Sequence, residues 1–162
     1  MAISTDDLYE RDFYAWTRQQ ATALRRLAAE RRNGPLDPAR LAEEVQDMGN
    51  EQRLAVESQL ERLMEHLVKL EWSVAREPRR QWMLSCLDAR THITARLTPT
   101  LRRAILPHLS KRWTNARRRA KLALMEHGEA DIANLFPETC PYGTDQLLDP
   151  DWWPASRQGI ES

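Results

Sequence analysis

Apolar residues recur at steps of three and four positions along most of the chain, which is the spacing of one face of an α-helix. The first such segment covers about residues 12–32 and carries a row formed by Phe13, Trp16, Gln20, Leu24 and Leu27. Gly34 and Pro35 follow it, and both residue types interrupt helices. The pattern therefore predicts an amphipathic helix before position 34.

The second segment is the longest and covers about residues 38–75. Asp37 suits the N-cap of a helix, and Pro38 suits its first position. Two apolar rows follow, one formed by Leu41, Val45 and Met48 and the other by Val56, Leu60, Leu63, Leu67, Leu70 and Val74. Gly49 and Asn50 lie between the rows, where they either end one helix and begin another or belong to one continuous helix. The sequence leaves both alternatives open.

Two further helices and a short helical piece are predicted beyond Pro78. The third segment, about residues 79–97, has an apolar face formed by Trp82, Met83, Cys86, Leu87, Ile93 and Leu97. Thr98 and Pro99 suit the cap and first position of a short piece over 100–106. The fourth segment reaches about residue 127, with an apolar face formed by Leu109, Trp113, Ala116, Ala120 and Ala123 or Leu124. Gly128 suits its C-cap.

Four long amphipathic helices with short, proline-marked connections predict an all-α fold, and specifically an antiparallel, up-and-down four-helix bundle. No strand-like alternation of useful length interrupts the pattern. The 162 residues are enough for one domain with a core of its own. We expect the bundle over about 12–127, an apolar C-terminal strap over about 128–154 packed on it, and a flexible end at 155–162.

The segment after the fourth helix is too apolar and aromatic for a disordered tail, and two prolines, Pro137 and Pro141, restrict its backbone. We interpret it as a strap across the bundle. The alternative is a partner-binding patch formed by Trp152, Trp153 and Tyr142, because exposed tryptophan often dominates binding energy at interfaces. Cys140 lies among acidic neighbours that disfavour a thiolate, so we do not expect it to be catalytic.

The net charge of zero hides a strong asymmetry. Residues 1–72 have a net charge of −4, residues 73–127 of +10, and residues 128–162 of −6. The basic block could bind a polyanion through Arg112, Arg117, Arg118, Arg119 and Lys121. We favour pairing with the acidic blocks of the same chain, because these flank the basic block and match it in size. Nucleic-acid binding through residues 102–121 is the alternative.

Other chemistry has little support in the sequence. A metal site built from His66 and His92 with a glutamate would lack the Glu-x-x-His spacing of helical metal proteins. The acids Glu43, Glu44 and Asp47 suit the dipole of a helix start. The chain contains neither a Gly-rich phosphate loop nor a Gly-x-Ser-x-Gly motif. We therefore assign no catalytic, cofactor or metal residue, and we do not expect an enzyme.

The sequence also favours a cytoplasmic location. Its first residues lack the basic and apolar regions of a secretory signal, and no run of 18 apolar residues could span a membrane. Its two cysteines, Cys86 and Cys140, lie in unlike contexts and form no Cys-x-x-Cys pair. A reduced, cytosolic chain is the simpler interpretation.

Three motifs carry a family resemblance. They are Tyr9-x-x-Asp12-Phe13-Tyr14-x-Trp16, Leu41-Ala42-Glu43-Glu44-Val45-x-Asp47-Met48-Gly49 and Phe136-Pro137-Glu138-Thr139-Cys140-Pro141-Tyr142. In this order they resemble the bacterial domain-of-unknown-function family 29, over about residues 9–154. The resemblance implies a cytoplasmic, all-helical, bundle-like protein and no catalytic residues.

The sequence patterns and the family resemblance together lead to three functional hypotheses. The first is a non-enzymatic helical protein that binds or scaffolds through protein contacts, with a protein partner or a second copy of itself. The second is polyanion binding through the basic segment. The third is an enzyme or a metal-binding bundle.

Overall fold

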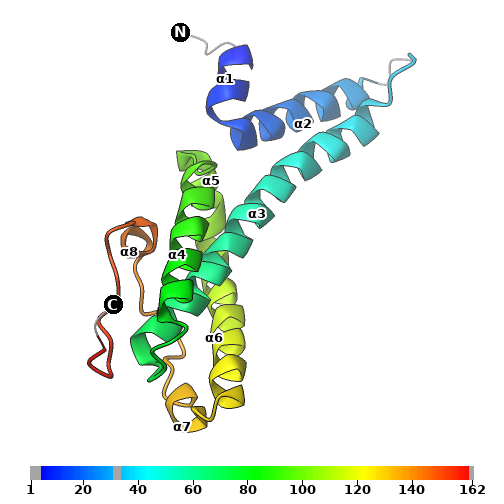
Figure 1. The fold of residues 1–162 in the computed structure, drawn as a ribbon. Helices are drawn as coiled ribbons and strands as arrows, with labels where there is room; N and C mark the ends of the chain where they lie inside the picture. Colours follow the sequence, from blue (N-terminus) through cyan, green and yellow to red (C-terminus); the bar gives the residue numbers. More distant parts are fainter. Residues whose placement is uncertain (1–4, 31–33, 161–162) are drawn as a thin grey trace. The chain divides into compact units, whose positions relative to one another are not determined.

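The computed structural model describes residues 5–30 and 34–160, and this part of the chain contains helices and no β-strand (Figure 1). The longer helices are α1 (Thr5–Arg11), α2 (Phe13–Ala29), α3 (Pro38–Trp72), α4 (Arg79–Thr94), α5 (Pro99–Ile105) and α6 (Leu109–Glu126). The short ones are η1 (Leu106–His108), α7 (Ala130–Ala133) and α8 (Thr144–Leu148). The all-α class is confirmed. No helix within these residues is long and apolar enough to cross a membrane.

Local sequence signals set several helix ends as predicted. The backbone N–H of Arg40 donates to Asp37 Oδ1 at 3.1 Å, and α3 begins at Pro38. The N–H of Leu101 donates to Thr98 Oγ1 at 3.2 Å at the start of α5. Gly128 has a φ of 81° after α6, a left-handed conformation that glycine adopts without strain. The predicted end of the first helix at residues 31–32 lies outside the described residues.

Gly49 and Asn50 do not interrupt α3, which is one helix of 35 residues. Gly49 instead lies in the contact between α3 and Thr17 of α2. A Cβ atom at this position would lie 2.2 Å from Thr17 Oγ1 and 3.2 Å from Thr17 Cβ. The absence of a side chain therefore allows α2 and α3 to approach closely.

The chain divides into two compact units. Unit 1 comprises the residues up to Ala55 together with Leu97–Leu106, and unit 2 comprises Val56–Arg96 together with the residues from Pro107 onward. Helix α3 begins in unit 1 and ends in unit 2, whereas α2 belongs to unit 1 and α4 and α6 belong to unit 2. The single domain and the up-and-down grouping of the four long helices stay predictions.

Unit 1 is built on an antiparallel hairpin of α2 and the first half of α3. Arg25 of α2 hydrogen-bonds Gln46 of α3, and Thr17 lies against Gly49. The buried residues of the hairpin are Tyr14, Thr17 and Ala21 in α2 and Ala42 and Gly49 in α3. Helix α5 packs against α2. The rings of Tyr9, Phe13 and Trp16 cluster at the start of α2, with centroids 4.9–5.8 Å apart.

Unit 2 buries the apolar faces that the sequence predicted. Its core is formed by Val56, Leu60, Leu63, Leu67 and Leu70 of α3, Cys86, Ala89 and Ile93 of α4, and Trp113, Ala116, Ala120 and Leu124 of α6. The predicted row members Trp82, Met83 and Leu109 are half-buried, and two others are exposed. Val74 is 49% exposed because α3 ends at Trp72, before the predicted end at residue 75, and Leu87 is 38% exposed on α4.

The C-terminal segment packs on the helices of unit 2, where α8 contacts α4 (Figure 1). Phe136, Tyr142 and Leu147 are buried. The Arg90 guanidinium, itself buried, donates to the carbonyl oxygens of Leu147 at 3.0 Å and Trp152 at 2.9 Å. It also donates to those of Gln146 and Pro150, at 3.3 and 3.5 Å. One arginine of α4 thus holds four carbonyl groups of the segment.

Candidate functional site

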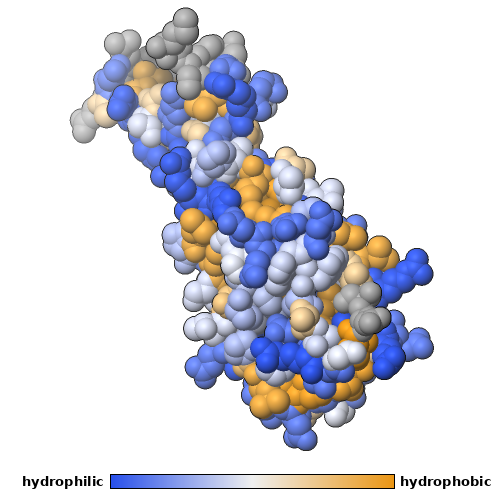
Figure 2. All heavy atoms as spheres, turned by 90° about the vertical axis from the view of Figure 1, so that its left-hand side faces the viewer, coloured by the Kyte–Doolittle hydropathy of each residue, from blue (hydrophilic) through white to orange (hydrophobic). Residues whose placement is uncertain are grey.

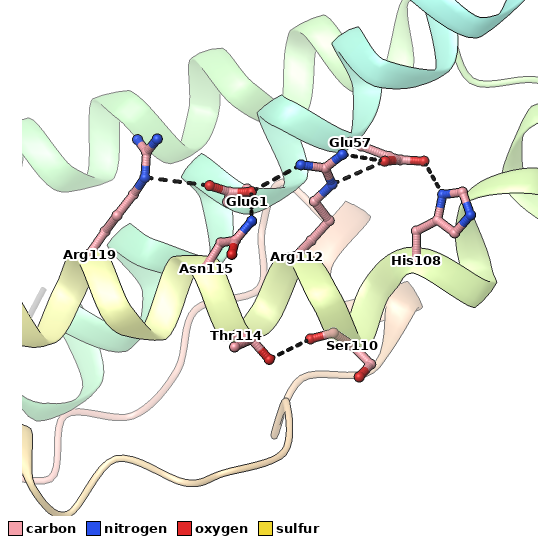
Figure 3. Close-up of polar contacts among 8 residues, drawn as sticks. All are labelled: Glu57, Glu61, His108, Ser110, Arg112, Thr114, Asn115 and Arg119. Carbon is pink, nitrogen blue, oxygen red and sulfur yellow. Dashed lines mark hydrogen bonds and ion pairs between the residues drawn. The ribbon is translucent and has the colours of Figure 1, made fainter.

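The basic face of α6 meets a buried glutamate of α3. Glu57 is only 1% exposed, and its Oε2 accepts hydrogen bonds from Arg112 Nε at 3.0 Å and Arg112 Nη2 at 2.7 Å (Figure 3). Its other oxygen lies 2.6 Å from His108 Nδ1. A buried carboxylate needs such partners, because desolvating an unpaired charge is costly.

Glu61, one turn later on α3, continues this network. Its carboxylate accepts from Arg112 Nη1 at 3.3 Å and Asn115 Nδ2 at 3.1 Å, and it pairs with Arg119 Nε at 3.4 Å (Figure 3). Burial lowers the pKa of Arg112, but its hydrogen bonds to Glu57 and Glu61 outweigh this and raise the pKa overall. The ions are therefore held in fixed pairs that join α3 to α6.

These contacts account for most of the predicted polyanion-binding residues. Arg112 and Arg119 pair with acids of the same chain, and Arg117 donates to the carbonyl oxygen of Phe136 at 3.1 Å. Arg118 is exposed and Lys121 is half-buried on α6. Internal pairing is confirmed for Arg112 and Arg119, and polyanion binding stays a prediction.

Sequence reasoning missed Glu57 and Glu61, although a signal for them was present. Each acid directly follows a residue of the second apolar row, Val56 or Leu60, so it lies at the border of a buried face. Acids four residues apart at such a border, opposite a basic helix, predict interhelical pairing. The signal becomes specific only when the partner helix is known.

A polar cleft of about 310 Å³ lies beside this network and includes His66. Burial, followed by the positive charge of Lys69, lowers the pKa of His66 to about 4. Its Nδ1 atom and Gln59 Oε1 are buried without a hydrogen-bond partner. His92, the other predicted metal candidate, is exposed. Within the described residues, no group of three or more His, Cys, Asp or Glu side chains could hold a metal ion.

The aromatic residues of the C-terminal segment contact their own chain. Tyr142 is 8% exposed, and its hydroxyl donates to Glu71 Oε2 at 2.7 Å. Trp152 and Trp153 are half-buried, the first against the Tyr142 ring and the second under the Arg90 guanidinium, 4.9 Å from its ring centroid. Their role in binding a partner stays a prediction, with Tyr142 turned inward.

Figure 2 shows the side of unit 2 that carries the C-terminal segment, where hydrophobic residues are interspersed with hydrophilic ones. Cys140, in the same segment, is half-buried, and burial raises the pKa of its thiol. A raised pKa disfavours the thiolate that nucleophilic chemistry requires.

A second cavity, of about 580 Å³, lies where α3 and α6 end and α4 begins. Its walls include Trp82 and Leu124, and its polar groups include Lys69 and Glu129. Lys69 already pairs with Glu65 at 2.6 Å, and Glu129 already accepts from the backbone and side chain of the 73–74 turn. The cavity has the size of a small-molecule site, but its charged side chains Lys69 and Glu129 already bind other groups of the same chain.

The apolar rows of unit 1 are partly open to solvent. Leu27 of α2 is 38% exposed, and Leu41 and Met48 of α3 are 39% and 48% exposed. Leu24 and Val45, the other members near these three, are half-buried. Unit 1 thus leaves open much of the apolar surface that the sequence places on its helices.

The two rows lie on the same side of the hairpin. Each buried contact residue directly follows a row residue, as in Trp16–Thr17, Gln20–Ala21, Leu41–Ala42 and Met48–Gly49. Successive residues of a helix point about 100° apart around its axis. On each helix, the apolar row therefore lies about 100° around the axis from the side that contacts the other helix. Because α2 and α3 run in opposite directions, this rotation brings both rows to one side. We call its open part the hairpin face, formed by Leu24, Leu27, Leu41, Val45 and Met48.

Comparison with known proteins gives two matches. The family described as Domain of unknown function DUF29 matches residues 8–153. The crystal structure of an alpha-helical protein of unknown function from Rhodospirillum rubrum ATCC 11170 is similar, with a TM-score of 0.76 and 26% sequence identity, covering 89% of this chain and 90% of that chain. A search of curated proteins gives no match. The family match covers most of the chain, which therefore belongs to the DUF29 family.

Proposed function

We propose that this member of the DUF29 family is a non-enzymatic binding or scaffolding protein that acts through protein contacts, with the hairpin face as its contact surface. The observation that supports this is the exposure of apolar residues on two neighbouring helices, 38% at Leu27, 39% at Leu41 and 48% at Met48. Apolar side chains that gather on one exposed face mark interaction sites in soluble proteins.

The polyanion alternative has weaker support. Arg112 and Arg119 already pair with buried or nearly buried acids, and Arg117 with a backbone carbonyl. Binding phosphates with these side chains would take the arginine partners away from Glu57 and Glu61. That loss is costly for a buried carboxylate.

We further propose that the protein acts in the cytoplasm. Cys86 and Cys140 are both free thiols, and Cys86 is fully buried. Free thiols suit a reducing compartment. Cell fractionation with an antibody against the native protein tests this, and recovery in an oxidising compartment would contradict it.

Site-specific photocrosslinking in cells tests the contact surface. A photoreactive amino acid placed at Leu27 or at Met48 should form a covalent adduct with a protein, because a partner covers the hairpin face. The matched control is the same group at Leu84, which is 47% exposed on α4. Adducts that are absent at both hairpin positions, or equally strong at Leu84, would overturn the proposal.

A further inference from the structure

We infer that the cavity of about 580 Å³ in unit 2 binds a small organic amine with an apolar body, and that the carboxylate of Glu129 is the counter-ion of its ammonium group. This inference is separate from the hairpin face and does not depend on it. Three observations carry it: the apolar walls of the cavity, the unbalanced charge of a buried carboxylate in its lining, and an aromatic ring in the same lining.

The walls of the cavity suit the body of an apolar ligand. The apolar residues of the lining are Ala75, Pro78, Trp82, Ala123 and Leu124. Small-molecule sites have volumes of about 300–1,000 Å³ and combine mostly apolar walls with a few polar groups. All of these lining residues belong to unit 2, so the cavity lies within one compact unit.

Glu129 places an unbalanced negative charge in the lining of the cavity. It is 9% exposed, and its carboxylate accepts hydrogen bonds from Ser73 Oγ at 2.8 Å and from the N–H of Val74 at 2.6 Å. Both donors are neutral, so they position the carboxylate without balancing its charge. Among the described residues, no lysine, arginine or histidine forms an ion pair with it. Because a buried charge is costly without an opposite charge, a cationic ligand would stabilise it.

The other charged groups of the lining favour a cation over an anion. Glu77 is a second acid. Lys69 also lines the cavity, but its ammonium group lies 2.6 Å from Glu65 Oε1, so its charge is already balanced. His127 is exposed, so water screens any charge that it carries. An anionic ligand would have to displace Glu65 from Lys69 and would face the charge of Glu129, whereas an ammonium group meets neither obstacle.

Trp82 supplies an aromatic ring that suits a cationic ligand. The face of such a ring attracts ammonium groups, and Lys69 Nζ already lies 6.0 Å from the centroid of the Trp82 ring. Because Trp82, Leu124 and Glu129 line the same cavity, one ligand can pack its apolar body on the first two and direct its ammonium group toward the third.

The first experiment compares three probes of similar size and different charge, namely phenethylamine, phenethyl alcohol and phenylacetate. Ligand-observed NMR titration at neutral pH measures their dissociation constants for the full-length protein. Phenethylamine should bind about tenfold more tightly than phenethyl alcohol, because only the amine forms a charged hydrogen bond with a carboxylate. Phenylacetate should bind more weakly than the alcohol, because its charge repels that of Glu129.

The second experiment separates the charge of Glu129 from its shape. Glu129→Gln keeps an acceptor oxygen for Ser73 and Val74 but removes the charge, so the preference for the amine should disappear while the alcohol binds as before. The control Glu126→Gln removes the same charge at an exposed position of α6 outside the cavity lining and should keep the preference. Circular dichroism checks that each variant remains helical.

A third variant tests the cavity even if Glu129→Gln does not fold. Ala123→Phe adds a large side chain at a half-buried lining position and leaves Glu129 in place, so it should abolish binding of the amine and the alcohol alike.

Four outcomes would overturn the inference. They are no measurable binding of phenethylamine, a dissociation constant for the amine no lower than that for the alcohol, a preference for the amine that persists in Glu129→Gln, and undiminished binding in Ala123→Phe. A preference that is lost in Glu129→Gln and kept in Glu126→Gln would support an organic amine as the ligand class.

Discussion

Single residues in this protein show how a local sequence signal and a distant contact compete. Asp37 and Thr98 were predictable as caps because a cap bonds to the residue three positions later in the chain. Gly49 was not, because its role depends on Thr17 in another helix. From the sequence, a glycine that ends a helix and one that admits a neighbouring helix look the same.

We predict that Gly49→Ala destabilises the protein by up to about 2 kcal/mol. Alanine favours the helix by about 1 kcal/mol over glycine, but its Cβ would meet Thr17 Oγ1 at 2.2 Å, and overpacking of this kind costs about 1–3 kcal/mol. Chemical denaturation followed by circular dichroism measures the change.

Two variants complete this test. Gly34→Ala is the control, because no atom lies within 4 Å of the new Cβ, and it should be nearly neutral. Thr17→Ala combined with Gly49→Ala should recover stability relative to Gly49→Ala. A stabilised Gly49→Ala variant would show that helix propensity outweighs the contact.

At the scale of elements, the apolar rows of the sequence predicted the buried residues of unit 2, but they did not predict those of unit 1. The rows of α3 and α6 in unit 2 are buried because helices or the C-terminal segment cover them. In unit 1 the buried residues are those that directly follow a row residue in the sequence. Two of them, Thr17 and Gly49, permit close contact between α2 and α3. Periodicity locates an apolar side, but the closest approach of two backbones depends on small residues beside it.

The C-terminal segment is the element whose attachment can be tested most directly. We predict that Arg90→Met destabilises the protein by roughly 2–4 kcal/mol, because four carbonyl groups lose a charged donor and hydrogen bonds to charged groups contribute about 1.5–3 kcal/mol. Arg80→Met, at an exposed position of the same helix, should change stability by less than about 0.5 kcal/mol.

Hydrogen exchange gives the element-level readout of Arg90→Met. Amides of residues 142–153 should exchange faster in this variant, whereas the amides of α2 should not change. Unchanged exchange in the C-terminal segment would mean that aromatic packing alone holds it, and that the arginine is dispensable.

For the molecule as a whole, the charge asymmetry predicted internal pairing but not its geometry. The pairs of Arg112 are formed with two acids of α3, the buried Glu57 and the nearly buried Glu61. Net charges of segments do not show which acids will be buried, because burial depends on the packing of α6 against α3. For the same reason the unpaired Nδ1 of His66 could not be foreseen.

The buried His66 should make the stability of the whole protein depend on pH. Burial and Lys69 lower its pKa from 6.5 to about 4 in the folded state, so unfolding takes up a proton between these values. The contribution of neutral His66 to the free energy of unfolding is fully present above pH 6.5. It declines as the pH falls toward about 4, because the unfolded chain binds a proton at His66 before the folded protein does. The denaturation midpoint of His66→Gln should therefore depend less on pH in this window. His92→Gln, at an exposed position, should follow the native curve.

The sharing of α3 between the two units has a consequence for how this protein can be inherited. The chain passes between the units at three places, after Ala55, Arg96 and Leu106, so each unit is discontinuous in the gene. No single cut separates the two units, because a fragment that contains all of one unit also contains part of the other. A single recombination event that transfers one unit whole therefore also transfers a piece of the other unit.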